Sequence, residues 1–476
     1  LTRCGGGRPS ENRFQTACFL LPAHIGYNAH SYYPVSGNFM PRRILLLALS
    51  IAAIPVWAKT LSQTLPNGLK VIVKEDRRAP VAVSQIWYKV GSIDEQAGKT
   101  GLSHALEHMM FKGTSVPSGE FNRRIAELGG QNNAYTNRSE TVYYENIAAA
   151  KLPEVLKLEA DRMQNLNFSD KDFANEMNVI REERRQRTED NPSGKLWEHV
   201  YLNSFTVPAL RAPIIGYMDD LHTLKADDLR AWYKQWYAPN NATLVIVGDV
   251  DAASTLKTAA KLFGGIPAKT LPARNNLTEK AEREPVTAQT TSAMTRQPII
   301  ALSYRVPKLE KSAGNMPYAL DVLSDILGGN SSSRLDKNLV RGKQAALNAG
   351  VSYDLFNREM PLFSIMAMPN DGVSEQSLLA AIRAEIKDIA DNGVGSEELK
   401  RVKTRMEASE IYARDSMVSQ ASLMGLLETR GFKYSDEAAI RRRLRQVSAA
   451  DVRAAAKLLT DSRSSVVTVR PETTRP

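Results

Sequence analysis

The hydrophobic pattern of the chain alternates between a two-residue period, typical of strands, and a period near 3.6, typical of helices. Residues 81–90 are apolar and β-branched, which predicts a buried strand, and residues 299–306 show the same pattern in the second half. The turn Asn67-Gly68 ends one strand, and another begins at 70–74. The two periods predict further strands at 132–135, 141–146 and 465–469, and helices at 121–128, 152–166, 170–187, 316–327, 379–392, 397–412 and 449–459.

The two halves of the chain repeat one order of elements. In each half a buried strand is followed by a loop, an apolar helix and a glycine-containing turn, and the two copies are roughly 210 residues apart. Between them, residues 264–298 are rich in Pro, Thr, Ala and charge and lack apolar periodicity, which is typical of a linker.

The first 58 residues differ from the rest. Residues 40–43 (MPRR) are basic, residues 44–53 are almost unbroken apolar, and residues 56–58 (VWA) are typical of a cleavage site. This pattern predicts a secretory signal peptide at 40–58 and an exported, periplasmic product. Residues 1–39 are expected to be an over-extended gene start or a disordered leader, and a genuine N-terminal extension is the alternative.

Removal of that segment changes the cysteine and charge balance. Both cysteines, Cys4 and Cys18, precede Met40, so the remaining chain has neither a disulfide nor a thiolate ligand for zinc. Residues 1–58 carry five arginines and one acid, so the net charge falls from +10 to +6. This mild, dispersed charge excludes the dense basic patch of a nucleic-acid-binding protein.

Residues 104–108 (HALEH) carry the most informative chemistry. On a helix, His104, Glu107 and His108 share one face, because side chains three and four residues apart are neighbours. Two imidazoles one turn apart can bind a single Zn²⁺, and the carboxylate between them can take a proton from a bound water. The order H-x-x-E-H is that of the inverted zinc peptidases. His199 and His222 are expected to be ordinary surface or core residues.

The helix predicted at 170–187 carries a candidate third ligand. Glu176, Val179, Ile180 and Glu183 lie on one stripe of that helix. An unpaired buried carboxylate is costly, so two acids on a partly apolar stripe indicate a metal or a cationic partner. The alternative is that Glu183 belongs, with its charged neighbours, to a solvated helix face. Spacing alone leaves both interpretations open.

Together these segments resemble the M16 family of zinc metallopeptidases, the pitrilysin and mitochondrial-processing-peptidase group. The likeness extends from about residue 60 to about residue 475 and rests first on H-x-x-E-H and on E-x6-E, whose second Glu lies 75 residues after His108. Shorter matches are found at 91–95, 110–114, 133–136, 160–163 and 190–192.

The resemblance implies a fold and a domain organisation. The expected fold is α+β, with two similar halves, each a mostly antiparallel sheet backed by helices, forming a clasp around a chamber. Residues 59–268 would be the zinc-binding catalytic half, 269–297 a linker, and 298–476 the metal-free half.

The resemblance also implies roles for single residues. His104, His108 and Glu183 would bind one Zn²⁺, Glu107 would act as the general base of a zinc-dependent endopeptidase, and Glu176 would orient the ligands. The strand at 133–136 would pair with an extended peptide. The substrate-binding residues would be Asn133, Ala134, Tyr135, Thr136 and Arg341.

One departure from the family concerns the metal-free half. Active members use an Arg and a Tyr, seven residues apart, to hold the substrate and the tetrahedral oxyanion. Here Arg341 is present, but Asn348 stands where Tyr is expected, and Tyr353 is out of register. Some bacterial members divide the site between a zinc-bearing chain and a sister subunit that supplies the Arg/Tyr pair. This chain resembles the zinc-bearing partner, so a hetero-oligomer is expected.

Two alternatives to peptide hydrolysis share features with this sequence. S-ribosylhomocysteine lyase also uses H-x-x-E-H, but it is a short cytosolic chain with a thiolate ligand, unlike this one. The second alternative is a scaffold or assembly subunit of the M16 type. The intact motif opposes that alternative, whereas the missing Tyr favours low activity of the isolated chain.

Overall fold

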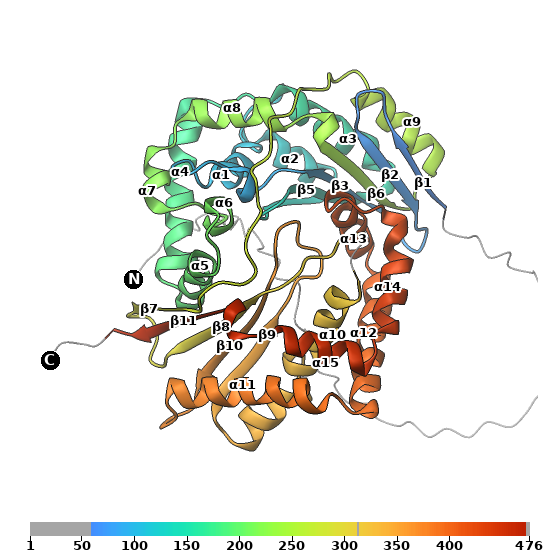
Figure 1. Cartoon of the computed structure of the whole chain (residues 1–476). Helices are drawn as coiled ribbons and strands as arrows, with labels where there is room; N and C mark the ends of the chain where they lie inside the picture. Colours follow the sequence, from blue (N-terminus) through green and yellow to red (C-terminus); the bar gives the residue numbers. More distant parts are fainter. Residues whose placement is uncertain (1–58, 312–313, 473–476) are drawn as a thin grey trace, which may run out of the picture.

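The computed structural model describes residues 59–311 and 314–472. The leader expected at 1–39 and the signal peptide expected at 40–58 lie outside the described residues. The described chain forms two halves, the first in the upper part of Figure 1 and the second below it. Within the two described ranges, no helix combines the length and the apolar character needed to cross a bilayer.

A six-stranded sheet forms the frame of the first half. Its strands, in order across the sheet, are β1 (Thr60–Thr64), β2 (Lys70–Glu75), β6 (Ala242–Gly248), β3 (Val81–Tyr88), β5 (Thr141–Ala148) and β4 (Gln131–Thr136). β2 and β6 are parallel, and the other neighbouring pairs are antiparallel. The apolar run predicted at 81–90 is therefore β3, an inner strand that is buried on both faces.

Helices cover one face of this sheet and enclose the larger hydrophobic core. Leu106, Leu156, Leu229 and Phe263, each from a different helix, are fully buried there with sheet residues such as Ile86. The helices of this half are α1 (Leu102–Met109), α2 (Glu120–Glu127), α3 (Leu152–Asn165), α4 (Asp170–Arg184), α5 (Pro192–Ser204), α6 (Pro208–Arg211), α7 (Met218–Thr223), α8 (Ala226–Trp236) and α9 (Ala252–Phe263).

The second half is built on a five-stranded sheet. Its strands, in order across the sheet, are β7 (Val286–Ser292), β11 (Ser464–Pro471), β8 (Ile299–Arg305), β10 (Leu362–Pro369) and β9 (Ala346–Ser352). Its helices are α10 (Met316–Gly328), α11 (Glu375–Asn392), α12 (Ser396–Asp415), α13 (Met417–Thr429), α14 (Glu437–Gln446) and α15 (Ala449–Leu458).

The two sheets have the same topology, which confirms two similar halves. The order β2-β6-β3-β5-β4 of the first sheet corresponds strand by strand to β7-β11-β8-β10-β9 of the second. In each sheet the first of these pairs is parallel and the rest are antiparallel. The mixed α/β fold, with each sheet backed by helices, agrees with the predicted fold class.

Each half places one helix on the face of the other half's sheet that the sheet's own helices leave uncovered (Figure 1). Ala421 and Met424 of α13 pack against Trp87 and Val245 of the first sheet. In the same way, α5 packs against β8 and β11 of the second sheet through an apolar cluster. Because these faces are apolar, the exchange of helices keeps both of them out of water.

The linker predicted at 269–297 is only partly correct. Residues 286–292 form β7, which pairs in parallel with β11 at the edge of the second sheet. The strand VTAQTTS alternates partly buried and exposed residues, and Val286 is the only large apolar residue in it. A short edge strand of this composition gives no apolar periodicity, so the pattern of the sequence could not distinguish it from a linker.

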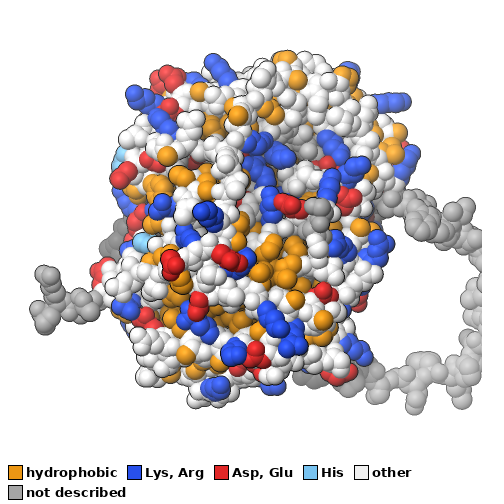
Figure 2. Space-filling model, viewed as in Figure 1, with side chains coloured by type: hydrophobic (Ala, Val, Ile, Leu, Met, Phe, Trp, Pro, Cys, Tyr) orange, Lys and Arg blue, Asp and Glu red, His pale blue; other side chains and the backbone are white. Residues whose placement is uncertain are grey.

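Charged side chains are dispersed over the surface. On the face drawn in Figure 2, Lys and Arg side chains are interspersed with Asp and Glu side chains. This distribution agrees with the mild charge calculated from the sequence.

The contact between α13 and the first sheet depends on Gly425, and this generates a stability prediction. A Cβ atom at Gly425 would overlap the indole ring of Trp87, which is 1% exposed. We expect Gly425→Ala to destabilise the protein by about 1–3 kcal/mol, although Ala favours a helix more than Gly does. Urea denaturation measures the change. Gly350→Ala is the control, because a Cβ there meets nothing within 4 Å, and equal stability of both variants would contradict the prediction.

Candidate metal centre

The helix α1 is buried along almost its whole length and carries the H-x-x-E-H motif. Leu102, Ala105, Leu106 and Met109 belong to the core of the first half. The polar residues of the motif face α4 and β4, which both contact α1. The apolar residues of α1 thus fix its orientation and direct its two imidazoles towards α4.

Three ligand atoms from α1 and α4 converge at one point. Oε2 of Glu183 lies 3.6 Å from Nε2 of His104 and 3.5 Å from Nε2 of His108. Two ligands bound to a tetrahedral Zn²⁺ at about 2.0–2.1 Å are about 3.3 Å apart. The observed separations are therefore close to those that a tetrahedral metal site requires, and these three residues form the group able to hold a metal within the described chain.

The hydrogen bonding of these atoms supports the same conclusion. Nε2 of His104, Nε2 of His108 and Oε2 of Glu183 are buried and have no hydrogen-bond partner in the described structure. Buried polar atoms without partners are costly, and three of them at one point are accounted for by a cation. The residues present therefore fit a divalent metal, with one position left for water.

Glu183 differs from its neighbours on α4. The side chain of Glu183 is 15% exposed, whereas that of Glu182 is 54% exposed and pairs with Arg185. The structure therefore favours the metal interpretation over a solvated helix face for Glu183. Of the two apolar residues on the stripe, Ile180 is buried but Val179 is 51% exposed.

Charged residues hold both ligand-bearing side chains in place. Nδ1 of His108 lies 3.1 Å from Oε2 of Glu176, whose other oxygen binds Nζ of Lys112 at 2.5 Å. The second oxygen of Glu183, Oε1, binds Arg187 at 2.8 Å. Arg187 lies in the π-helical turn Arg185–Glu189, which continues α4. Such contacts orient ligands and tune their affinity for a metal.

The protonation of this group responds to the two carboxylates. Burial lowers the pKa of His104 to about 3, so its ring is neutral. Burial also disfavours protonation of His108, but the neighbouring carboxylates of Glu176 and Glu183 outweigh it and raise the pKa of His108 to about 9. Burial raises the pKa of Glu183, but His108 and His104 outweigh it and lower that pKa to about 2. The site thus favours a positive charge between the imidazoles and the carboxylates.

Glu107 lies beside the ligands and is held by strand β4. The hydroxyl of Thr136 donates a hydrogen bond to Oε2 of Glu107 at 2.5 Å. Burial raises the pKa of Glu107 to about 7. A carboxylate in this position can exchange protons near neutral pH.

The predicted substrate residues Asn133, Ala134, Tyr135 and Thr136 lie on β4, at the edge of the first sheet. Among the described strands β4 pairs only with β5, so its outer edge is open. Ala134 faces the core, whereas Tyr135 packs edge-on against Trp87. Because Thr136 contacts Glu107, the open edge lies next to the candidate metal centre.

The structure does not bring Arg341 to this site. Arg341 lies in the π-helical segment Asp336–Gly342 of the second half, is 61% exposed, and pairs with Asp336 at 2.7 Å. Asn348 is exposed on β9, and Tyr353, directly after β9, packs partly buried against the second core. In the described chain, none of these three contacts His104, His108 or Glu183.

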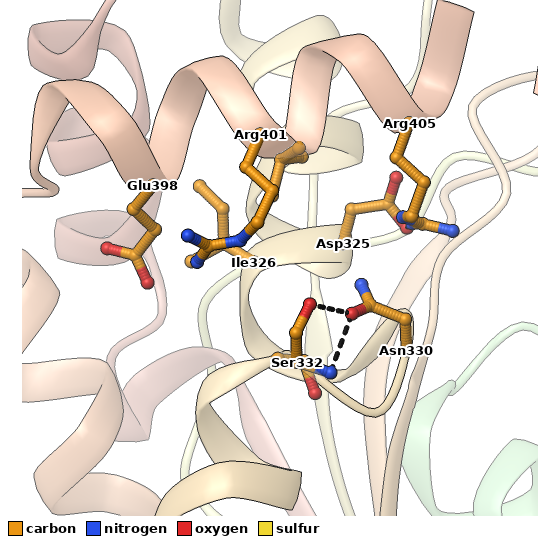
Figure 3. Close-up of a pocket in the computed structure, with 9 residues that line it drawn as sticks. Asp325, Ile326, Asn330, Ser332, Glu398, Arg401 and Arg405 are labelled. Carbon is orange, nitrogen blue, oxygen red and sulfur yellow. Dashed lines mark hydrogen bonds and ion pairs between the residues drawn. The ribbon is translucent and has the colours of Figure 1, made fainter. Parts of the chain in front are cut away.

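The corresponding position of the second half contains an ion pair. α10 follows β8 as α1 follows β3, and α12 precedes α13 as α4 precedes α5. Figure 3 shows Arg405 of α12 next to Asp325 of α10. In the loop below them, Ser332 is hydrogen-bonded to Asn330. The cavity there has a volume of about 10 Å³, no more than one water needs.

Sequence reasoning missed the residues that support the ligands. Lys112 and Thr136 lie in matched segments, but their bonds to Glu176 and Glu107 depend on the packing of α4 and β4 against α1. Arg187 could have been found, since it lies four residues after Glu183 on the same predicted helix.

Known proteins match most of this chain. Residues 70–216 match the family model described as Insulinase (Peptidase family M16), and residues 223–406 match the Peptidase M16 inactive domain. The zinc protease PqqE of Helicobacter pylori is 30% identical over 392 residues, which cover 80% of this chain and 86% of that protein.

Solved structures with the same fold include two bacterial proteases. A protease from Helicobacter pylori is 28% identical with a TM-score of 0.82, over 87% of this chain and 100% of that chain. The periplasmic protease PqqL from Escherichia coli has a TM-score of 0.73 at 21% identity, over 88% of this chain but only 48% of that chain.

The site generates a prediction about metal binding. We expect the purified chain to bind about one Zn²⁺, and Glu183→Gln to weaken that binding at least about ten-fold because the variant loses an anionic ligand. Competition with a chromophoric chelator measures the affinity. Glu182→Gln, a change of the same kind one residue earlier, should bind zinc as the unmodified chain does. Equal affinity of the two variants would remove Glu183 from the site.

Proposed function

Because the chain belongs to the M16 peptidase family, we propose that it is a zinc-dependent endopeptidase that hydrolyses peptides or short unfolded polypeptides. The observation that carries this proposal is the convergence of three unpartnered ligand atoms beside Glu107 and an open strand edge. Its relative PqqE is named a zinc protease, which supports zinc as the metal.

The residues of the site divide the chemistry between them. His104, His108 and Glu183 would hold Zn²⁺, which when bound lowers the pKa of water and polarises a carbonyl. Glu107 accepts a proton from the attacking water and passes it to the leaving amine. The Thr136 hydroxyl occupies Oε2 of Glu107, which leaves Oε1 for the proton. Glu176 fixes the ring of His108, since its Oε2 accepts a hydrogen bond from Nδ1–H of His108.

Strand β4 would bind the substrate as an additional strand. The backbone groups on its open edge can pair with an extended peptide, which places a peptide bond beside Glu107. Backbone pairing is independent of side-chain sequence, so it suits a range of unfolded polypeptides better than one folded substrate.

A second subunit would complete the site. The chain aligns with about half of PqqL, and the first half of PqqL has also been solved separately. A sister subunit could provide the other half, including the Arg/Tyr pair, because Asn348 replaces Tyr here and Arg341 lies away from the metal centre. The pattern at 40–58 and the periplasmic location of PqqL support an exported protein. An M16-type scaffold with little activity is the second candidate, which the absence of that Tyr favours.

The role of Glu107 generates the first functional prediction. We expect Glu107→Gln to lower kcat by about 10²–10⁴-fold, because the amide cannot accept the proton of the attacking water. The variant should still bind zinc, since Glu107 is not one of the converging ligands. Cleavage of a quenched fluorescent peptide and zinc analysis of the same sample measure both effects. Cleavage at the unmodified rate would contradict the role of Glu107 as base.

The division of the site between two subunits generates the second functional prediction. We expect the isolated chain to cleave peptides slowly and to gain at least about ten-fold in kcat/KM when the sister subunit is added, because the sister supplies the groups that bind the oxyanion. Titration of one subunit with the other, followed by peptide cleavage, measures the gain. Full activity of the isolated chain would exclude the divided site and leave the zinc chemistry intact.

A further inference from the structure

Residues 91–95 form a turn that caps the metal-binding helix. α1 has no side-chain cap at its N-cap residue, Gly101. Instead, the carboxylate of Glu95 accepts hydrogen bonds from the backbone N–H groups of Gly101 and Ser103, both at 2.7 Å. Glu95 is 3% exposed. Because Ser103 directly precedes His104, the position of the Glu95 carboxylate sets the position of the first metal ligand.

Asp94 ties this turn to residues outside the first half. One oxygen of its fully buried carboxylate binds Arg274 at 2.8 Å and Arg358 at 2.7 Å. The other oxygen accepts the backbone N–H of Gly91 at 3.1 Å. Arg274 lies in the segment between the halves, and Arg358 lies at the tip of the β9–β10 hairpin, which rises towards the first half in Figure 1.

The next residue of the hairpin, Glu359, reaches the turn that follows strand β4. One oxygen of Glu359 binds Nε of Arg138 at 3.1 Å, and the other accepts from the Ser139 hydroxyl at 3.2 Å. Burial raises the pKa of Glu359, but Arg138 and other arginines outweigh it, so the pKa is lowered and the carboxylate is charged. Arg138 also donates to the carbonyls of Leu210 and Ala212.

The two turns held by the hairpin also bind each other. The backbone N–H groups of Ser92 and Ile93 donate to the carbonyls of Asn137 and Arg138, at 3.3 and 3.0 Å. Arg138 is two residues from Thr136, which bonds Glu107. The tip of the hairpin therefore contacts the turn before α1 and the turn after β4 directly.

We propose that the tip of the β9–β10 hairpin positions the active site of the zinc-bearing half. Arg358 holds the cap of α1 through Asp94, and Glu359 holds strand β4 through Arg138. Neither residue contacts a metal ligand within the described chain, so both are positioning residues. The inference rests on the proposed function and assigns the metal-free half a part in it.

The alternative is that these ion pairs only join the halves. Another ion pair offers a matched comparison, since Lys70 of β2 binds Glu428 of α13 at 2.6 Å. This pair also joins the halves, but neither residue contacts the turns at 91–95 or 137–140 in the described structure. Loss of either pair should lower stability, whereas only loss of the hairpin contact should alter the metal.

The test compares Arg358→Met with Glu428→Gln in the purified full chain. We expect Arg358→Met to weaken Zn²⁺ binding about ten-fold and to change the visible spectrum of bound Co²⁺, because the ligands are held less well. With the sister subunit present, Arg358→Met should lower kcat by a larger factor than it changes KM. Glu428→Gln should lower the melting temperature and leave zinc affinity and the cobalt spectrum unchanged.

The outcomes separate the two proposals. If Arg358→Met does not fold, Arg358→Lys is measured instead, and it should show a smaller loss of zinc affinity. If Arg358→Met has the zinc affinity and the cobalt spectrum of the unmodified chain, the positioning role is overturned. The proposed zinc peptidase function would still stand. An unmodified chain that binds no zinc would overturn the proposed function itself.

Discussion

The candidate site depends on the mutual approach of two imidazoles and one carboxylate, whose facing atoms are buried. Each ligand atom at the centre of this group is buried without a hydrogen bond, and a buried polar atom in that state costs a few kcal/mol. The surrounding contacts do not relieve this cost; Glu176 and Arg187 bind the outer atoms of His108 and Glu183 and leave the inner ones free. A divalent cation bound there would satisfy all three inner atoms together, which would explain why the fold tolerates them.

The two halves depend on each other through their apolar faces. Each sheet has one face covered by its own helices and one by a helix of the other half, α5 or α13. Separation of the halves would expose Trp87, Val245 and the apolar face of the second sheet to water. Two ion pairs also join the halves, Arg138 with Glu359 and Arg358 with Asp94. Ion pairs depend on orientation, whereas apolar contact does not. The halves are thus held in one orientation.

The second half shows how the same fold is stable without a metal. Where α1 and α4 gather imidazoles and carboxylates, α10 and α12 carry Asp325 and Arg405 (Figure 3). The guanidinium provides a positive charge that belongs to the chain, so the carboxylate opposite needs no external cation. Asp325 is 22% exposed and is neutralised within the chain, whereas the facing atoms of His104, His108 and Glu183 have no hydrogen-bond partner in the described structure.

The sequence by itself determined the two similar halves, many of the strands and helices, and the helix that carries H-x-x-E-H. These features depend on local periodicity and on the fixed spacing of side chains within one helix. The sequence placed His104, Glu107 and His108 on one face, and the family resemblance selected Glu183. It predicted no strand at β6, β7, β9 or β10 and no helix at α5 to α9, α13 or α14. In β7 the polar composition hides an edge strand. Only the tertiary structure decided that Glu183 reaches the imidazoles, that Thr136 holds Glu107 and that Arg358 and Glu359 hold the turns around the site. These contacts join residues far apart in the chain, and their existence depends on how helices and sheets pack, which no local pattern encodes.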